Sequence, residues 1–137
     1  MALTPKRLEY EASVGESRRV QANGVAVEIS DSWHAEQLVL AGLVHCTLAS
    51  LRYHARHASI VVHRGRGAAS GTVTKRESDG RYALVEVRAA LDVEIDPEPD
   101  APALAELLAK AERDCFVGNS LSVRPEYGWQ VNGRDQA

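Results

Sequence analysis

The sequence predicts an α+β domain in which two helices cover a mostly antiparallel sheet, with the element order ββ-α-ββ-α-β. Three observations predict this class. Residues 33–57 contain no Gly or Pro except Gly42, and residues 38–51 are apolar on nearly all sides, which indicates a buried helix. Residues 85–95 alternate apolar and polar side chains, which indicates a strand with one buried face. Residues 104–115 have apolar side chains at i, i+3, i+4, i+7 and i+11, the stripe of a second helix.

The N-terminal elements are predicted from their turn residues. Residues 7–14 are predicted as a first strand that ends at a turn on Gly15. Residues 18–22 and 25–30 flank the Asn-Gly pair at 23–24, and both of these turn residues tolerate positive φ. A β-hairpin is therefore expected before the long helix.

The C-terminal elements follow the same logic. A Gly-rich strand and a turn at residues 77–80 precede the alternating strand. Asp100 is predicted to cap the second helix, and residues 118–119 (Gly-Asn) suit its end. Residues 121–131 alternate as a last strand, which Pro125 either restricts to a sheet edge or breaks in two.

Size and composition exclude several classes of protein. The chain has 137 residues, 45% of them hydrophobic and 26% charged, so one folded domain over residues 1–137 is expected. The net charge of −3 gives no basic excess for nucleic acid. The longest mostly apolar run, residues 37–51, is too short to span a membrane. The N-terminus lacks the layout of a signal peptide, so a cytoplasmic location is expected.

The two cysteines, Cys46 and Cys115, are the main chemical signal. Two cysteines make neither a disulfide-rich scaffold nor a zinc site of paired Cys-x-x-Cys knuckles. Both belong to apolar helical surface, and two helices that cover one sheet are expected to be neighbours. The pattern leaves two interpretations open: two inert buried thiols, or a redox couple that the fold brings together.

Three segments of the sequence resemble the OsmC/Ohr family, the osmotically inducible and organic-hydroperoxide-resistance proteins. Residues 36–46 (EQLVLAGLVHC) are similar to the family's central helix motif PE-x-L-x-x-A-x-x-x-C, with Ala35 in place of Pro. Residues 115–121 (CFVGNSL) resemble its second cysteine segment, with Phe116 in place of the common Pro. Residues 125–133 (PEYGWQVNG) resemble its last strand. The order and spacing of the elements agree with the family over nearly the whole chain.

The resemblance implies a thiol peroxidase that needs no cofactor. In the family, the first cysteine attacks the peroxide and the second resolves the sulfenic acid as an intramolecular disulfide, which a dithiol, lipoylated in one branch, then reduces. These roles correspond to Cys46 and Cys115. The family lowers the pKa of the first cysteine with an Arg that a helix Glu holds. Glu36 matches this Glu, and Arg18 is the preferred match for the Arg, with Arg19 as its alternative.

A homodimer with shared sites is also expected. Glu36 and Cys46 are ten positions apart, about 15 Å along a helix, so a Glu36 side chain does not reach its own Cys46. The helix over residues 38–51 is apolar on nearly all sides, and one sheet and one short helix cannot bury all of these sides. The resemblance implies the same intertwined dimer.

Two alternatives to the peroxidase function remain open. They are an OsmC-like binding or structural domain without peroxidase activity, and a structural domain with two buried thiols.

Two other motifs are expected to have no chemical role. His54 and His57 have i, i+3 spacing but no third ligand at a suitable spacing, so no metal site is expected. Residues 64–67 (Arg-Gly-Arg-Gly) lack the Lys-Ser/Thr of a phosphate loop and are interpreted as a flexible strand end or bulge. The side chains of His45 and Cys46 point in different directions because they are adjacent on a helix. His45 is therefore interpreted as a packing or interface residue.

Overall fold

The structure is a computed structural model that describes residues 4–15 and 19–136. The chain divides into two compact units, residues 1–34 and residues 35–137, and each is described by itself. The prediction of one domain over residues 1–137 stays a prediction.

The first unit contains a three-stranded antiparallel sheet in the order β1-β2-β3. Its strands are β1 (Ser13–Val14), β2 (Arg19–Ala22) and β3 (Val25–Glu28). The Asn-Gly hairpin is confirmed, because Asn23 and Gly24 have φ angles of 51° and 76°. The predicted strand over residues 7–14 is wrong in length: β1 pairs with β2 through Ser13 and Val14, and residues 7–12 pair with no strand among the residues that the structure describes.

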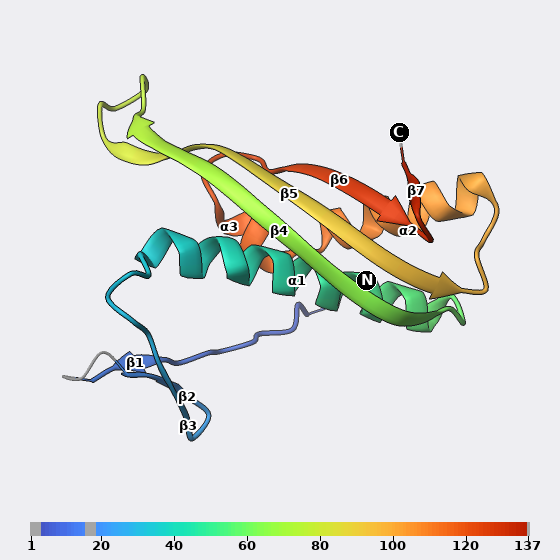
Figure 1. The fold of residues 1–137 in the computed structure, drawn as a ribbon, viewed down its shortest axis with the longest axis horizontal. Helices are drawn as coiled ribbons and strands as arrows, with labels where there is room; N and C mark the ends of the chain where they lie inside the picture. Colours follow the sequence, from blue (N-terminus) through green and yellow to red (C-terminus); the bar gives the residue numbers. More distant parts are fainter. Residues whose placement is uncertain (1–3, 16–18, 137) are drawn as a thin grey trace. The chain divides into compact units, whose positions relative to one another are not determined.

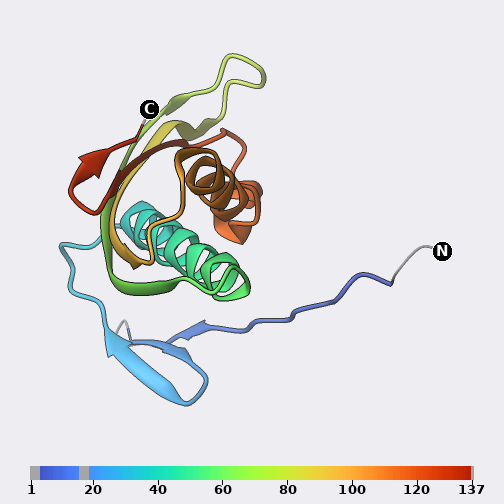
Figure 2. The same cartoon turned by 90° about the vertical axis from the view of Figure 1, so that its right-hand side faces the viewer.

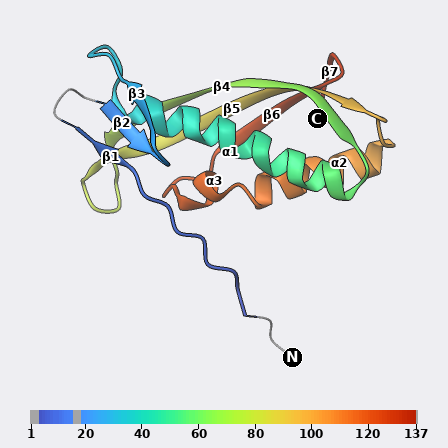
Figure 3. The ribbon, with the colours of Figure 1, turned by 90° about the horizontal axis from the view of Figure 1, so that it is seen from below.

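The second unit is a layer of helices on a four-stranded sheet. Its elements are α1 (Ala35–His57), β4 (Val61–Lys75), β5 (Tyr82–Asp96), α2 (Ala101–Arg113), α3 (Phe116–Ser120), β6 (Glu126–Val131) and β7 (Arg134–Asp135). The sheet order is β4-β5-β6-β7. Figure 1 shows α1, α2 and α3 on one side of this sheet. In Figure 2 the sheet curves around α1 and α2, which lie side by side, and Figure 3 shows the same helices from below.

The second sheet confirms the predicted α+β class and adds one parallel pair. β4 and β5 form a long antiparallel ladder, β6 is parallel to β5, and β7 is antiparallel to β6. β6 can run parallel because α2 and α3 lie between β5 and β6 in the chain, which is the helical crossover that parallel strands require. The predicted strand over residues 121–131 is wrong in length, because β6 begins at Glu126, directly after Pro125, and residues 121–125 are not in a strand.

The glycines of β4 let α1 approach the sheet closely. A Cβ on Gly67 would meet Val44 Cγ1 of α1 at 3.0 Å, and a Cβ on Gly65 would meet Leu48 Cδ2 of α1 at 3.2 Å. These glycines belong to the Arg-Gly-Arg-Gly segment, which lies inside β4. The interpretation as a flexible strand end is therefore wrong, because the absent side chains make room for helix packing. The alternative interpretation, a bulge, agrees with the register shift between Val62 and Arg64, which lies beside the segment.

The helix that precedes the second cysteine ends earlier than predicted. Asp100 caps α2 as expected, with its side chain accepting from Ala103 N at 2.9 Å. α2 stops at Arg113, and Cys115 has extended backbone angles (φ −78°, ψ 105°) as the N-cap of α3. The predicted helix end at residues 118–119 is wrong, because both residues belong to α3.

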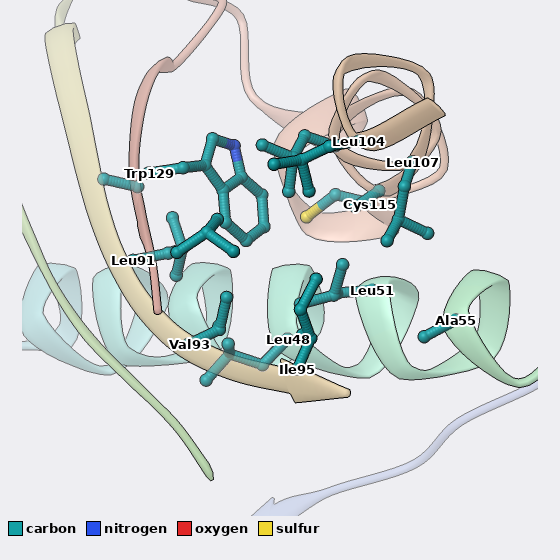
Figure 4. Close-up of a cluster of buried hydrophobic side chains, with 14 of the residues drawn as sticks. Leu48, Leu51, Ala55, Leu91, Val93, Ile95, Leu104, Leu107, Cys115 and Trp129 are labelled. Atoms are coloured by element: carbon teal, nitrogen blue, oxygen red, sulfur yellow. The ribbon is translucent and has the colours of Figure 1, made fainter. Parts of the chain in front are cut away.

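The core lies between the helices and the sheet. Figure 4 shows Cys115 among leucines of α1 and α2, with Trp129 of β6 reaching toward the same cluster. The side chains of Leu43 and Leu51 on α1 are fully buried, as is Cys115. Each fully buried leucine contributes about 1.5–3 kcal/mol to folding, so this cluster fixes the position of α1 and of the residues it carries.

Candidate functional site

The structure brings the two cysteines together where α1 contacts α3. Cys46 lies in the middle of α1 and is half-buried, whereas Cys115 is fully buried at the junction of α2 and α3. Both are free thiols, and a side-chain hydrogen bond with Cys115 is one of the causes that raise the pKa of Cys46. The sulfur atoms are therefore neighbours. The prediction that two helices covering one sheet place both thiols side by side agrees with this geometry.

The surroundings of Cys46 favour its neutral thiol. Burial is the largest cause that raises the pKa of Cys46, and charge on Cys115 raises it further. The backbone N–H groups of Val117 and Phe116 act in the opposite direction, because they hydrogen-bond the sulfur and favour the thiolate. Within residues 4–15 and 19–136, no cationic side chain lowers the pKa of Cys46. The described residues thus partly stabilise a thiolate at Cys46 and leave its pKa raised.

Cys115 is surrounded by polar groups of three different elements. The Thr47 hydroxyl on α1 donates its proton to Leu43 O at 2.7 Å, and its oxygen, which lies 3.3 Å from the Cys115 sulfur, accepts from the Cys115 thiol. The backbone N–H of Gly118 in α3 donates to the same sulfur at 3.4 Å. The Cys115 thiol is therefore held by hydrogen bonds as well as by packing.

Tyr127 of β6 completes the surroundings of Cys115. A Cβ on Gly118 would clash with the Tyr127 hydroxyl and would stand 3.4 Å from the Cys115 sulfur. The pKa of Tyr127 is raised, first by burial and then by the charge and hydrogen bonding of Cys115, while hydrogen bonding to Thr47 lowers it. Sequence reasoning missed Thr47 and Tyr127. Thr47 had one usable signal, a hydroxyl on an otherwise apolar stretch of helix.

A surface hollow reaches this group of residues from the side of α2 and β6. Its volume is about 540 Å³, and its lining includes Glu112, Gly118 and Tyr127. Glu112 is fixed by a hydrogen bond from Trp129 Nε1 to its Oε2 at 2.9 Å. The carboxylate of Glu112 is also among the charges that raise the pKa of Tyr127. Tyr127 therefore lies between the buried Cys115 and an opening to solvent.

The three other predicted site residues, Glu36, Arg18 and Arg19, are not grouped with Cys46. Glu36 is in the second unit, whereas the two arginines belong to the first unit. Glu36 is exposed in the first turn of α1 and is ten positions from Cys46, a rise of about 15 Å. Arg19 lies on β2, where its Nη2 is 3.2 Å from Glu28 Oε1. Arg18 lies outside the described residues. The activating pair implied by the resemblance remains a prediction.

Two histidines in the C-terminal part of α1 have partners within the protein. His54 Nε2 lies 2.7 Å from Asp114 Oδ2, and His57 Nδ1 lies 2.9 Å from Tyr53 O. In the part of the chain that the structure describes, no three His, Cys, Asp or Glu side chains are grouped so that they could hold a metal ion. Among the same residues, no helix has the length and apolar character needed to cross a membrane.

Comparison with known proteins identifies the family. The family model described as OsmC-like protein matches residues 30–128. The chain belongs to the OsmC-like protein family. The matched segment includes both cysteines and Glu36, so the resemblance found in the sequence is confirmed at the level of the family.

Solved structures of OsmC-like proteins share this fold. An OsmC-like protein from Mycoplasma pneumoniae has a TM-score of 0.72 at 15% identity, covering 93% of this chain and 99% of its own. The organic hydroperoxide resistance protein OhrB of Bacillus subtilis has a TM-score of 0.58 at 19% identity, covering 89% and 96%. An organic hydroperoxide resistance protein from Elizabethkingia anophelis, with thiocyanate bound, has a TM-score of 0.63 at 19% identity, covering 94% and 99%. The comparison with curated proteins found no match.

Proposed function

We propose that this OsmC-like protein is a thiol peroxidase that reduces organic hydroperoxides or hydrogen peroxide as an antioxidant enzyme. The observation that carries the proposal is the meeting of the chain's two cysteines, one half-buried and one fully buried, at the contact of α1 and α3. The family includes proteins named for organic hydroperoxide resistance, which supports this substrate class.

The unequal burial of the cysteines supports different roles for them. Cys46 is the peroxidatic residue, because a peroxide reaches the half-buried sulfur first. Its thiolate attacks the O–O bond, takes one oxygen as a sulfenic acid and releases the alcohol or water after protonation. Cys115 is the resolving residue: its sulfur displaces the sulfenic oxygen as water and forms the Cys46–Cys115 disulfide. A dithiol, such as a lipoylated protein, restores both thiols by exchange. We place this cycle in the cytoplasm, where free thiols persist.

The raised pKa of Cys46 means that the peroxidatic step needs a cation from elsewhere. We propose that Arg18 or Arg19, held by Glu36, supplies it across a homodimer. Three features support a dimer. Leu38 and Val39 on α1 are each 39% exposed. β4 is a long strand at a sheet edge, with one side unpaired by the described residues. The sheet of the first unit has Val25 and Val27 exposed, which adds apolar surface that a second copy would cover.

A second candidate function is also compatible with the raised pKa of Cys46. An OsmC-like binding or structural domain without peroxidase activity would also keep Cys46 as a neutral thiol, as burial favours here. In that case the two thiols would simply pack together. The two functions differ in whether a peroxide oxidises the thiols.

Thiol counting distinguishes the two functions. One equivalent of cumene hydroperoxide should remove both thiols of the reduced wild-type protein and produce one intramolecular disulfide. Cys115→Ser should form a sulfenic acid at Cys46 that a dimedone probe traps, complete one turnover and then overoxidise. Cys46→Ser should consume no peroxide. Unchanged thiols in the wild type would refute the peroxidase and favour the binding or structural domain. Equal loss of the first turnover in both variants would refute the assignment of roles.

A further inference from the structure

We propose that His54 and Asp114 are positioning residues of the resolving step, because the hydrogen bond between them holds Cys115 against the part of α1 that carries Cys46. The inference rests on the proposed peroxidase function and concerns how that function keeps its two thiols within reach of each other. Both residues act through the position of the Cys115 sulfur and take no part in the chemistry themselves.

Cys115 lies at a break between two helices. α2 ends at Arg113, Asp114 is its C-cap, and Cys115 has extended backbone angles (φ −78°, ψ 105°) before α3 begins. The Cys115 N–H donates to Glu112 O at 3.3 Å rather than to the carbonyl four residues earlier. Because the regular helical hydrogen bonds are interrupted here, side-chain contacts must hold the cysteine in place.

The Asp114 side chain links this break directly to α1. Its Oδ2 lies 2.7 Å from Nε2 of His54, whose side chain is 13% exposed. A hydrogen bond from Arg113 is the largest cause that lowers the pKa of Asp114 to about 2, so at neutral pH this carboxylate only accepts hydrogen bonds. The proton of the shared hydrogen bond therefore belongs to His54 Nε2. Such a bond to a charged acceptor is stronger than one between neutral groups.

The link matters because α1 also carries Cys46. His54 is seven positions after Thr47, close to two full turns, so both side chains project from the same face of α1. Thr47 directly follows Cys46, and its Oγ1 lies 3.3 Å from the Cys115 sulfur. Contacts at positions 47 and 54 thus attach Cys115 and the residue before it to one face of one helix. This arrangement holds Cys115 near Cys46 before the sulfenic acid forms.

A fixed Cys115 speeds the resolving step by raising its effective concentration at Cys46. In this step the Cys46–Cys115 S–S bond forms, the S–O bond of the sulfenic acid breaks, and the Cys115 proton leaves with the oxygen as water. Groups that are held in a reactive geometry behave as if at high concentration, and a mobile segment loses this advantage.

Arg113 provides an internal contrast to His54. Its Nη2 lies 2.8 Å from the same Asp114 carboxylate oxygen, and its Nε lies 3.0 Å from the other oxygen. Arg113 belongs to the same segment as Asp114, however, so this pair cannot attach the segment to α1. We therefore expect loss of the His54 contact, and not loss of the Arg113 contact, to free Cys115 from α1.

The test measures the effective concentration in the full-length protein, equilibrated at neutral pH with mixtures of reduced and oxidised dithiothreitol. Reduced dithiothreitol breaks the Cys46–Cys115 bond, yields two protein thiols and closes to its own cyclic disulfide. His54→Ala should shift this equilibrium toward the reduced protein by about three- to tenfold, because a partly buried hydrogen bond to a carboxylate is lost. After addition of cumene hydroperoxide, disulfide formation should slow by a similar factor, while sulfenic acid formation at Cys46 keeps its rate.

Two matched variants separate positioning from a loss of stability. Arg113→Gln removes the other partner of Asp114 and should keep the wild-type disulfide equilibrium. His54→Gln retains an N–H donor near the place of Nε2 and should stay close to the wild type. A wild-type equilibrium in His54→Ala would overturn the inference, as would equal shifts in His54→Ala and Arg113→Gln. A wild-type protein whose thiols do not react with peroxide would instead refute the proposed function, since the dithiothreitol equilibrium needs no peroxide.

Discussion

Gly67 lies where α1 crosses β4, and a Gly67→Ala substitution tests whether this close approach holds the cysteine-bearing helix on the sheet. The added Cβ would stand 2.6 Å from Ala90 O, 2.9 Å from Leu91 Cδ1 and 3.0 Å from Val44 Cγ1. The first of these atoms is backbone of the neighbouring strand β5. It cannot move away without disturbing the β4–β5 ladder, so the helix and the strand must both shift.

The expected loss of stability follows from two opposing effects. Replacing Gly by Ala restricts the unfolded chain and would by itself stabilise the protein by about 0.4–1 kcal/mol. Overpacking a close contact costs about 1–3 kcal/mol, and the backbone oxygen at 2.6 Å places this site toward the upper part of that range. The net effect should be a loss of about 1–2 kcal/mol. For a chain of this size, the melting temperature should fall by roughly 4 °C for each kcal/mol lost.

Urea unfolding at one fixed protein concentration measures this loss. The concentration is held constant because the stability of the proposed dimer would depend on it. Gly128→Ala is the matched control: it lies on β6, and a Cβ there would meet nothing within 4 Å. The control should be as stable as the wild type or slightly more stable. Equal stability of Gly67→Ala and Gly128→Ala would refute the close approach of α1 to β4.

Two further predictions concern assembly and acid stability. Sedimentation equilibrium at low micromolar concentration should show a dimer, and a peroxide-consuming species near 15 kDa, close to the 14.9 kDa of one chain, would contradict it. In a mixed dimer of Cys46→Ser and Glu36→Ala chains, only the site that joins an intact Cys46 to an intact partner Glu36 should react. A hydrogen bond from Arg113, and then His54, lower the pKa of Asp114 to about 2. The stabilisation of the folded protein by ionised Asp114 is therefore complete above the unfolded pKa of about 3.9, and it is lost as the pH falls toward 2. Asp114→Asn should flatten the loss of stability between about pH 4 and pH 2 in acid titrations followed by circular dichroism, whereas an unchanged slope would show that Asp114 does not contribute.

The sequence determined the elements whose signals are local. The Asn-Gly hairpin follows from the backbone freedom of two residues, and the Asp100 cap follows from a carboxylate next to free backbone N–H groups. The apolar run of α1 and the alternation in β5 depend on nearest neighbours along one helix or one strand, so their periods could be recognised. The cysteine segments likewise identified the family because they are short and contiguous.

The sequence failed where the outcome depends on segments that are distant along the chain. A strand needs a partner, and no local pattern shows that residues 7–12 have none in the described part of the chain. The parallel pairing of β6 with β5 depends on the path of the chain through α2 and α3. The glycines of residues 64–67 looked like a flexible segment because the side chains that fill their space, those of Val44 and Leu48, belong to another element.

The site divides in the same way. Residue type alone singled out Cys46 and Cys115, because thiols are rare and reactive. Only the tertiary structure placed Cys115 at the N-cap of α3, beside Thr47 of α1 and Tyr127 of β6. A hydroxyl in a sequence has no direction, and its chemistry depends on which atom lies within about 3 Å of it. That distance is set by the packing of three elements that are far apart in the chain, which the sequence does not show.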